Sequence, residues 1–143
     1  MNSESLILIV DDREDDQLLL ERMLRKVGVL NRIQKLTDGE QALSFFKGDP
    51  PYCDRKQYPL PRVLFLDLSL PMLDRLKVLD LIYFLSINTE AYIFIYSLVS
   101  NVKEIGCIYR LGADSLLQKP LRECNLLSLI DHFPEAWILD RPR

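Results

Sequence analysis

The sequence is short of two residue types on which many catalytic and metal sites depend. It contains one histidine, His132, and three cysteines, Cys53, Cys107 and Cys124, which stand far apart. A histidine-based triad or a multi-histidine metal site therefore lacks partners, and no cysteine pair has the C-x-x-C spacing of a zinc site. We expect reduced thiols, and we expect His132 to be a partly exposed residue near the end of the last helix.

Excess positive charge and long apolar runs are also missing. The formal net charge is −3, whereas a sequence-independent grip on nucleic-acid phosphates needs a concentrated basic face. Apolar runs such as Leu6–Val10 are far shorter than the roughly 20 residues that cross a bilayer. The first residues, Met1–Ser5, have no basic region of the kind that begins a signal peptide. We expect a cytoplasmic protein that binds neither nucleic acid nor membrane.

The length of 143 residues and the 48% share of hydrophobic residues fit a single compact domain. Short apolar runs alternate in it with amphipathic segments. The predicted strands are Leu6–Val10, Ile33–Leu36, Val63–Leu66, Tyr92–Tyr96 and Ser115–Leu117. The predicted helices are Asp15–Val27, Glu40–Lys47, a segment from Asp74 to Tyr83, a segment from Val102 up to Gly112, and a segment traced by the apolar residues from Leu126 to Phe133. Such alternation indicates an α/β fold with a doubly wound parallel sheet.

Two segments fall outside this alternation. Residues 49–61 contain four prolines and cannot continue a helix or a central strand, so we expect an ordered surface insertion. The last residues, 134–143, form a short tail whose apolar residues Trp137, Ile138 and Leu139 are expected to cover an edge of the fold.

Five polar residues stand at the carboxyl ends of predicted strands. They are Asp11, Asp12, Asp67, Ser97 and Lys119. In an open α/β sheet, ligands bind beyond these ends at the point where the strand order reverses, which in a 2-1-3-4-5 order lies between the first and third strands. The three aspartates would meet there. Converging carboxylates repel one another unless a cation neutralises them, and Mg²⁺ suits because it leaves positions for water and phosphate oxygens.

This set of residues is suited to phosphoryl transfer. One carboxylate attacks phosphorus while a metal ion, a hydroxyl and a fixed cation stabilise the charge on the phosphoryl oxygens. Asp67, Ser97 and Lys119 would be the nucleophile, the hydroxyl and the cation. Each residue also has an ordinary explanation, such as a helix N-terminal acidic pair for Asp11 and Asp12. We favour a shared site because it accounts for the strand-end position of all five residues at once.

At these positions the sequence resembles the response-regulator receiver family, in its single-domain, chemotaxis-receiver-like form. The matching motifs, in chain order, are Ile7–Asp12, Leu64–Met72, Ser97, Gly112–Asp114 and Lys119-Pro120. The similarity extends from about residue 6 to residue 133. It implies the flavodoxin-like receiver fold, a doubly wound five-stranded parallel sheet of order 2-1-3-4-5.

The resemblance also implies a role for each matching residue. Asp67 would be the phospho-acceptor, and Asp12 and Asp67 would be direct ligands of Mg²⁺. Asp11 would act mainly through a metal-bound water, and the backbone carbonyl of Ser69 would complete the ligands that the protein supplies. Lys119 would pair with one phosphoryl oxygen and Ser97 would hydrogen-bond another. The Lys119-Pro120 peptide bond would be cis.

By the same resemblance the protein would be a signalling switch and not an enzyme, apart from its own phosphoryl acceptance and slow self-dephosphorylation. A sensor histidine kinase or a phosphotransfer protein would supply the phosphoryl group. A conformational change would then pass the signal to a downstream protein target. A homodimer would form through the face made by the fourth helix, the fifth strand and the fifth helix.

The sequence departs from the family pattern at three positions. Leu116 stands where the family usually has an aromatic residue, Arg75 replaces a glycine and Leu98 replaces a small residue. The departures at Leu116 and Arg75 support an alternative, a phosphorylation-independent pseudo-receiver that acts as a protein–protein binding module. A small phosphatase with an aspartyl nucleophile ranks last, because Asp67–Ser69 lacks a second aspartate two residues after the first to act as general acid.

Overall fold

One parallel sheet organises the chain. The structure is a computed structural model that describes residues 5–67, 80, 83–84, 90–97, 109 and 112–140. Its strands are β1 (Ile7–Val10), β2 (Ile33–Leu36), β3 (Val63–Asp67), β4 (Tyr92–Ser97) and β5 (Ser115–Gln118). They pair in the order β2-β1-β3-β4-β5, and every pairing is parallel. The predicted doubly wound five-stranded sheet of order 2-1-3-4-5 is confirmed.

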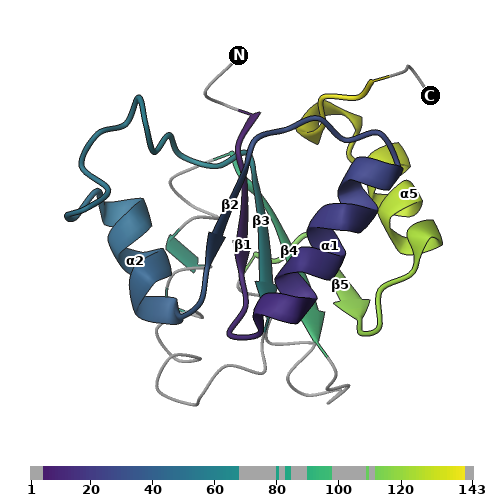
Figure 1. The fold of residues 1–143 in the computed structure, drawn as a ribbon, viewed down its shortest axis with the longest axis horizontal. Coiled ribbons are helices and arrows are strands. Elements are labelled where there is room, and N and C mark those ends of the chain that lie inside the picture. Colours follow the sequence, from purple (N-terminus) through teal and green to yellow (C-terminus); the bar gives the residue numbers. More distant parts are fainter. Residues whose placement is uncertain are drawn as a thin grey trace.

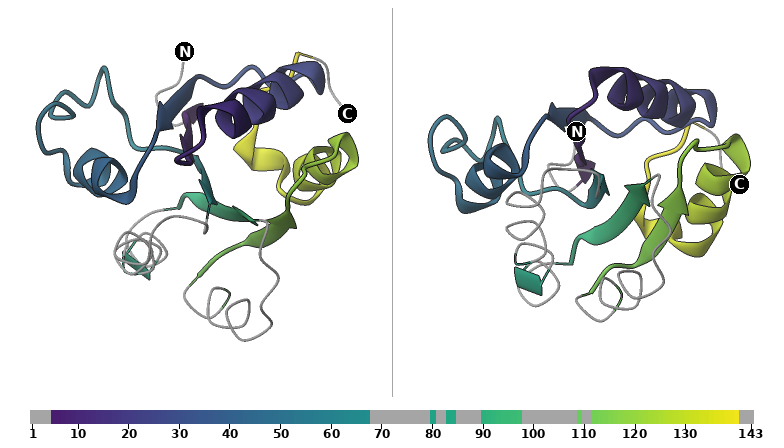
Figure 2. Two further views of the ribbon diagram at one scale, coloured as in Figure 1. Left: turned by 60° about the horizontal axis from the view of Figure 1, so that its bottom comes forward. Right: turned by 90° about the horizontal axis from the view of Figure 1, so that it is seen from below.

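Helices cover both faces of this sheet (Figure 1, Figure 2). Helices α1 (Glu14–Lys26) and α5 (Glu123–His132) lie on one face, α2 (Gly39–Lys47) lies on the other, and a 3₁₀ turn (Pro134–Ala136) follows α5. Helix α5 begins at Glu123, three residues before Leu126, the first of the apolar residues that trace this helix in the sequence. The reason is a cap: the Asn125 side chain accepts a hydrogen bond of 2.8 Å from the Arg122 backbone N–H, which satisfies a donor that the helix start leaves unpaired.

Several sequence-based expectations fall outside the described residues. Most of the predicted helix from Val102 up to Gly112 is among them, and so is most of the predicted helix from Asp74 to Tyr83. Ser69, Arg75, Leu98 and Cys107 also lie outside. Cys53 and Cys124 are free and exposed. His132 is exposed at the last position of α5, as predicted.

The two faces of the sheet have separate cores, because successive strand residues point to opposite faces. In β1, Leu8 and Val10 pack with α2, whereas Ile7 and Ile9 pack with α1 and α5. All four residues are buried, which explains why this strand is a continuous apolar run in the sequence. The sheet is therefore enclosed on both faces, and its carboxyl-terminal edge is where polar groups gather.

The proline-rich segment of residues 49–61 lies against helix α2. The rings of Tyr52 and Tyr58 have their centroids 5.2 and 6.1 Å from that of Phe45. The Arg55 guanidinium donates to the backbone carbonyls of Phe45 and Phe46, at 2.7 and 2.8 Å. Helix ends leave such carbonyls without an intrahelical partner, so Arg55 caps the helix that precedes its own segment.

The tail, residues 134–143, was expected to cover an edge of the fold, and its described residues pack into the core and pair with the chain after α1. Trp137 is 8% exposed, and its ring stacks on Phe94 with centroids 5.9 Å apart. Leu139 forms an antiparallel bridge with Val29.

The buried Asn31 side chain donates to the carbonyls of Ser5 and Ala136, at 2.6 and 3.1 Å. It also accepts from the N–H of Ile138 at 2.7 Å. One buried amide thus joins the tail to the start of the chain.

Asn31→Ala is expected to lower the free energy of unfolding by about 2 kcal/mol, because buried polar groups left without a partner cost about 1–3 kcal/mol. Urea denaturation followed by circular dichroism measures the change. Asn125→Ala is a suitable control, since it removes one bond at a partly exposed helix end and should cost about 1 kcal/mol or less. Equal losses in the two variants would contradict the role assigned to Asn31.

Candidate functional site

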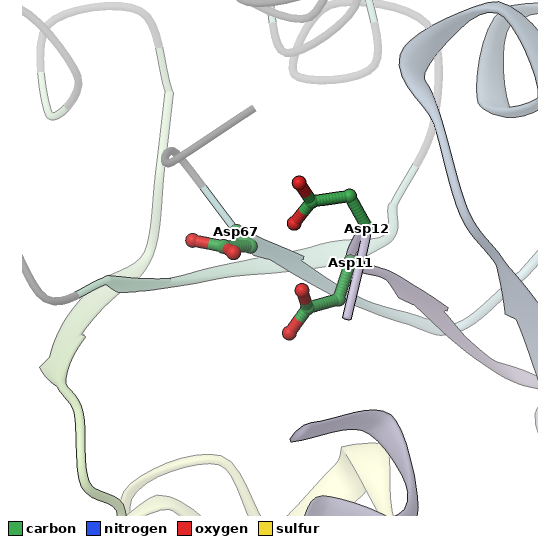
Figure 3. Close-up of side chains that lie close together, drawn as sticks. All are labelled: Asp11, Asp12 and Asp67. Atoms are coloured by element: carbon green, nitrogen blue, oxygen red, sulfur yellow. The ribbon is translucent and has the colours of Figure 1, made fainter. Parts of the chain in front are cut away.

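Three carboxylates converge beyond the carboxyl ends of β1 and β3 (Figure 3). Asp67 is the last residue of β3, and Asp11 and Asp12 follow β1 directly. Each offers an oxygen, and these oxygens lie within 4.8 Å of one another. Because β1 and β3 are neighbours in the sheet, residues that are distant in sequence meet here, at the predicted reversal of strand order.

Lys119 reaches this cluster from the end of β5. Its ammonium donates to carboxylate oxygens of Asp11, Asp16 and Asp67, at 3.0, 2.9 and 3.1 Å. All three ammonium protons are thereby used. Burial by itself would lower the pKa of Lys119, but the hydrogen bonds to Asp16 and Asp11 and the negative charge of Asp67 outweigh it and raise that pKa. Lys119 is therefore held as a cation. The Lys119-Pro120 bond is cis, as expected.

Asp11 is the most enclosed of the three carboxylates, with 0% of the residue exposed. Its Oδ1 accepts from the backbone N–H of Arg13 at 2.9 Å. Its Oδ2 accepts from the Tyr96 hydroxyl at 2.7 Å and from Lys119. Burial raises the pKa of the Asp11 carboxyl, the charge of Asp67 adds to this, and the hydrogen bonds only partly offset it. A nearby cation would favour the ionised form.

Comparison with known proteins bears on this arrangement. A family model described as the response regulator receiver domain matches residues 7–131. The chain belongs to this family. Receiver domains are signalling modules of two-component systems and are generally not enzymes. They interact with histidine kinases or phosphotransfer proteins and with downstream targets, and they bind Mg²⁺ or Mn²⁺ at an acidic cluster.

Relatives of similar length come from different organisms. The probable methanogenesis regulatory protein FilR2 of Methanothrix harundinacea is 26% identical over 133 residues, which cover 93% of this chain and 83% of that protein. The response regulator Rcp1 of Synechocystis is 23% identical over 137 residues, covering 96% and 91%. The crystal structure of the response regulator RPA3017, in red light signalling of R. palustris, superimposes with a TM-score of 0.78 and 25% identity, covering 96% of this chain and 99% of that one.

Ser97 stands at the end of the strand that pairs with β3. It is the last residue of β4 and is 1% exposed. It follows Tyr96, so the two side chains project from opposite faces of the sheet. Leu116 lies beside Ile95 in the strand register and is partly buried against the α2-side core. An aliphatic side chain therefore fills the place at which the family usually has an aromatic ring.

Two residues of the site were missed from the sequence, Asp16 and Tyr96. Asp16 lies in the first turn of α1, where acidic residues are common because of the helix dipole. The excess of carboxylates between Asp11 and Asp16 was a usable signal. Tyr96 belongs to a strand whose other inward residues are apolar, and it lies opposite Asp67 in the sheet, a register that the sequence alone does not show. Burial and the charge of Asp11 raise the pKa of Tyr96, so its hydroxyl keeps its proton.

The carboxylates suit a hard divalent cation. Asp12 is exposed, and its carboxylate has no hydrogen-bond or ion-pair partner among the described residues, so its oxygens are open to a cation. The Asp11 oxygens already accept from three protein donors, and a carboxylate has about four acceptor sites. Asp11 therefore has room for one more bond, which fits contact through a water. An all-oxygen set with few carboxylates is typical of Mg²⁺.

None of the helices in the described part of the chain combines the length and the hydrophobicity that crossing a bilayer requires.

Proposed function

We propose that this receiver domain accepts a phosphoryl group on Asp67 with Mg²⁺ bound, and that it signals by a change of conformation. The observation that carries the proposal is the position of Lys119 within hydrogen-bond distance of Asp67 at a cluster of three carboxylates. A nucleophile, a fixed cation and metal ligands are thereby gathered at one point, as phosphoryl transfer requires.

The metal ligands would be Asp12 and Asp67 directly, Asp11 through a water, and the carbonyl of Ser69, which lies outside the described residues. When bound, Mg²⁺ supplies positive charge that offsets the charge on the phosphoryl oxygens. An Asp67 oxygen forms a bond to phosphorus as the bond between phosphorus and the donor's histidine nitrogen breaks, and that nitrogen keeps the electron pair. Lys119 turns from Asp67 to one phosphoryl oxygen, and the Ser97 hydroxyl donates to another.

The partners follow from this chemistry. A sensor histidine kinase or a phosphotransfer protein supplies the phosphoryl group, and a downstream protein target binds the phosphorylated form. The solved Mn²⁺-bound form of Rcp1, at 22% identity and a TM-score of 0.72, supports the binding of a divalent cation by a protein of this fold. The homodimer through the fourth helix, β5 and α5 is a further proposal that involves residues outside the described part.

The test uses the whole chain, Mg²⁺ and acetyl phosphate as a small phosphodonor, with intact mass as the readout. We expect one added phosphoryl group, and none when a chelator removes Mg²⁺, because the bare carboxylates repel an incoming phosphate. A wild-type protein that gains no phosphoryl group under these conditions would refute the proposal.

Leu116 favours one second candidate, a binding module that works without phosphorylation. If an aliphatic residue at this position prevents Ser97 from signalling to the surface, partner binding would not depend on the acceptor. In that case Asp67→Asn would leave the affinity for the partner unchanged, whereas the switch requires that affinity to depend on phosphorylation of Asp67.

A further inference from the structure

The hydroxyl of Tyr96 lies in the site, and neither the metal nor the phosphoryl step assigns it a role. It donates a hydrogen bond of 2.7 Å to Oδ2 of Asp11. The residue is 1% exposed. Its ring meets Phe65 edge-on, with centroids 6.2 Å apart, and the Lys119 ammonium lies 4.7 Å from its centroid. The ring is therefore held from two sides, and the hydroxyl is aimed at Asp11.

Asp11 has few donors to replace this hydroxyl. It is fully buried, and its three protein donors leave about one acceptor site for a water. Among the described residues, the side chains that donate to Oδ2 are those of Tyr96 and Lys119. In the proposed phosphoryl step Lys119 turns toward a phosphoryl oxygen, which leaves Tyr96 as the side-chain donor. A buried carboxylate oxygen without donors is destabilised. The Arg13 N–H still donates to Oδ1, and the Tyr96 hydroxyl keeps Oδ2 hydrogen-bonded and in place when Lys119 moves.

We propose that Tyr96 is a positioning residue for the metal site, because its hydroxyl fixes the Asp11 carboxylate beside Asp12 and Asp67. The part of this inference that concerns Lys119 rests on the proposed function. The part that concerns metal binding can be measured without phosphorylation. Partners that orient a metal ligand typically change metal affinity or activity by about 10- to 100-fold when they are removed.

The first experiment measures binding of Mn²⁺ to the unphosphorylated protein, by the electron paramagnetic resonance signal of the free ion, and of Mg²⁺ by calorimetry. Tyr96→Phe keeps the ring and its packing and removes only the hydroxyl. We expect its affinity for either ion to fall about 10-fold. Tyr92→Phe is the matched control, since it makes the same change in the same strand where the hydroxyl bonds Glu135 at 3.3 Å, and it should bind as the wild type does.

A double variant separates positioning from packing. If Tyr96 acts through Asp11, Tyr96→Phe should cause no further loss of affinity in an Asp11→Asn background. An affinity of Tyr96→Phe equal to that of the wild type would overturn the inference. So would an equal loss in Tyr92→Phe, or a full additional loss in the double variant.

A Mg²⁺ titration of phosphorylation by acetyl phosphate gives the second readout. For Tyr96→Phe we expect the half-saturating Mg²⁺ concentration to rise about 10-fold, with the rate restored at saturating Mg²⁺. Weaker ion binding in the variant together with no phosphorylation of the wild type would refute the proposed function and leave the positioning role standing. Phosphorylation of both proteins with the same Mg²⁺ dependence would refute the positioning role alone. A wild type that binds neither ion would refute both.

Discussion

Asp67→Asn is expected to abolish phosphoryl acceptance and to leave the fold intact. The amide that replaces the carboxylate carries no negative charge and is a poor nucleophile toward phosphorus. Asparagine has nearly the same shape, so the packing at the end of β3 is kept. Intact mass after incubation with Mg²⁺ and acetyl phosphate should therefore show no added phosphoryl group, and the circular dichroism spectrum should match that of the wild type.

The control for this result is Asp15→Asn. Asp15 is an exposed aspartate in the first turn of α1, close in sequence to the site but without an assigned role, and this variant should accept a phosphoryl group as the wild type does. A phosphoryl group retained by Asp67→Asn would place the acceptor on another residue, and peptide mapping would identify it.

Lys119→Met is expected to lower the free energy of unfolding of the metal-free protein by about 3 kcal/mol. The Lys119 ammonium neutralises three carboxylates, and its side chain is 8% exposed. Removing one partner of a buried ion pair typically costs about 3–5 kcal/mol. We place the loss at the lower end because Asp16 is partly solvated, with 27% of its side chain exposed. Urea denaturation at neutral pH without divalent ions measures the effect.

Neutral pH suits this measurement because Lys119 is then fully charged in the folded protein. The pKa of Lys119 lies above its ordinary value of 10.5. The ion pairs therefore contribute fully below that pH, and their contribution disappears only as the pH rises through the higher pKa of the folded state. Mg²⁺ should restore part of the stability of Lys119→Met, because an ion that binds only the folded state stabilises it.

Lys26→Met is the matched control. Lys26 pairs with Glu123 at 3.2 Å, but 72% of its side chain is exposed, and such surface pairs contribute about 0–1 kcal/mol. If Lys119→Met is no more destabilising than Lys26→Met, the ion pairs of Lys119 are not the stabilising contacts that their burial indicates.

The sequence predicted that Asp11 and Asp67 lie at neighbouring strand ends, because strand ends are determined by short local patterns. The β1 run from Ile7 to Val10 and the aspartates after it have one simple interpretation, a buried parallel strand that ends in polar groups. Once the strand order follows from the family resemblance, the meeting of Asp11 and Asp67 follows as well. No side-chain conformation is needed for that step.

Asp16 and Tyr96 could not be placed in the same way. Their roles depend on how α1 packs against the sheet and on which face of β4 each residue occupies, and both are properties of the assembled fold. The position of Trp137 had the same limit, since nothing local in the tail specifies that its ring stacks on Phe94. Residues that support a site from a second element are thus harder to predict than residues at the end of a strand.

The burial of Trp137 also gives this receiver domain a natural optical probe. It is the only tryptophan in the chain, and its indole N–H has no hydrogen-bond partner among the described residues. An indole in such an apolar setting fluoresces at shorter wavelengths than one in water. A shift of the emission to longer wavelengths would therefore report release of the tail from the sheet without any added dye.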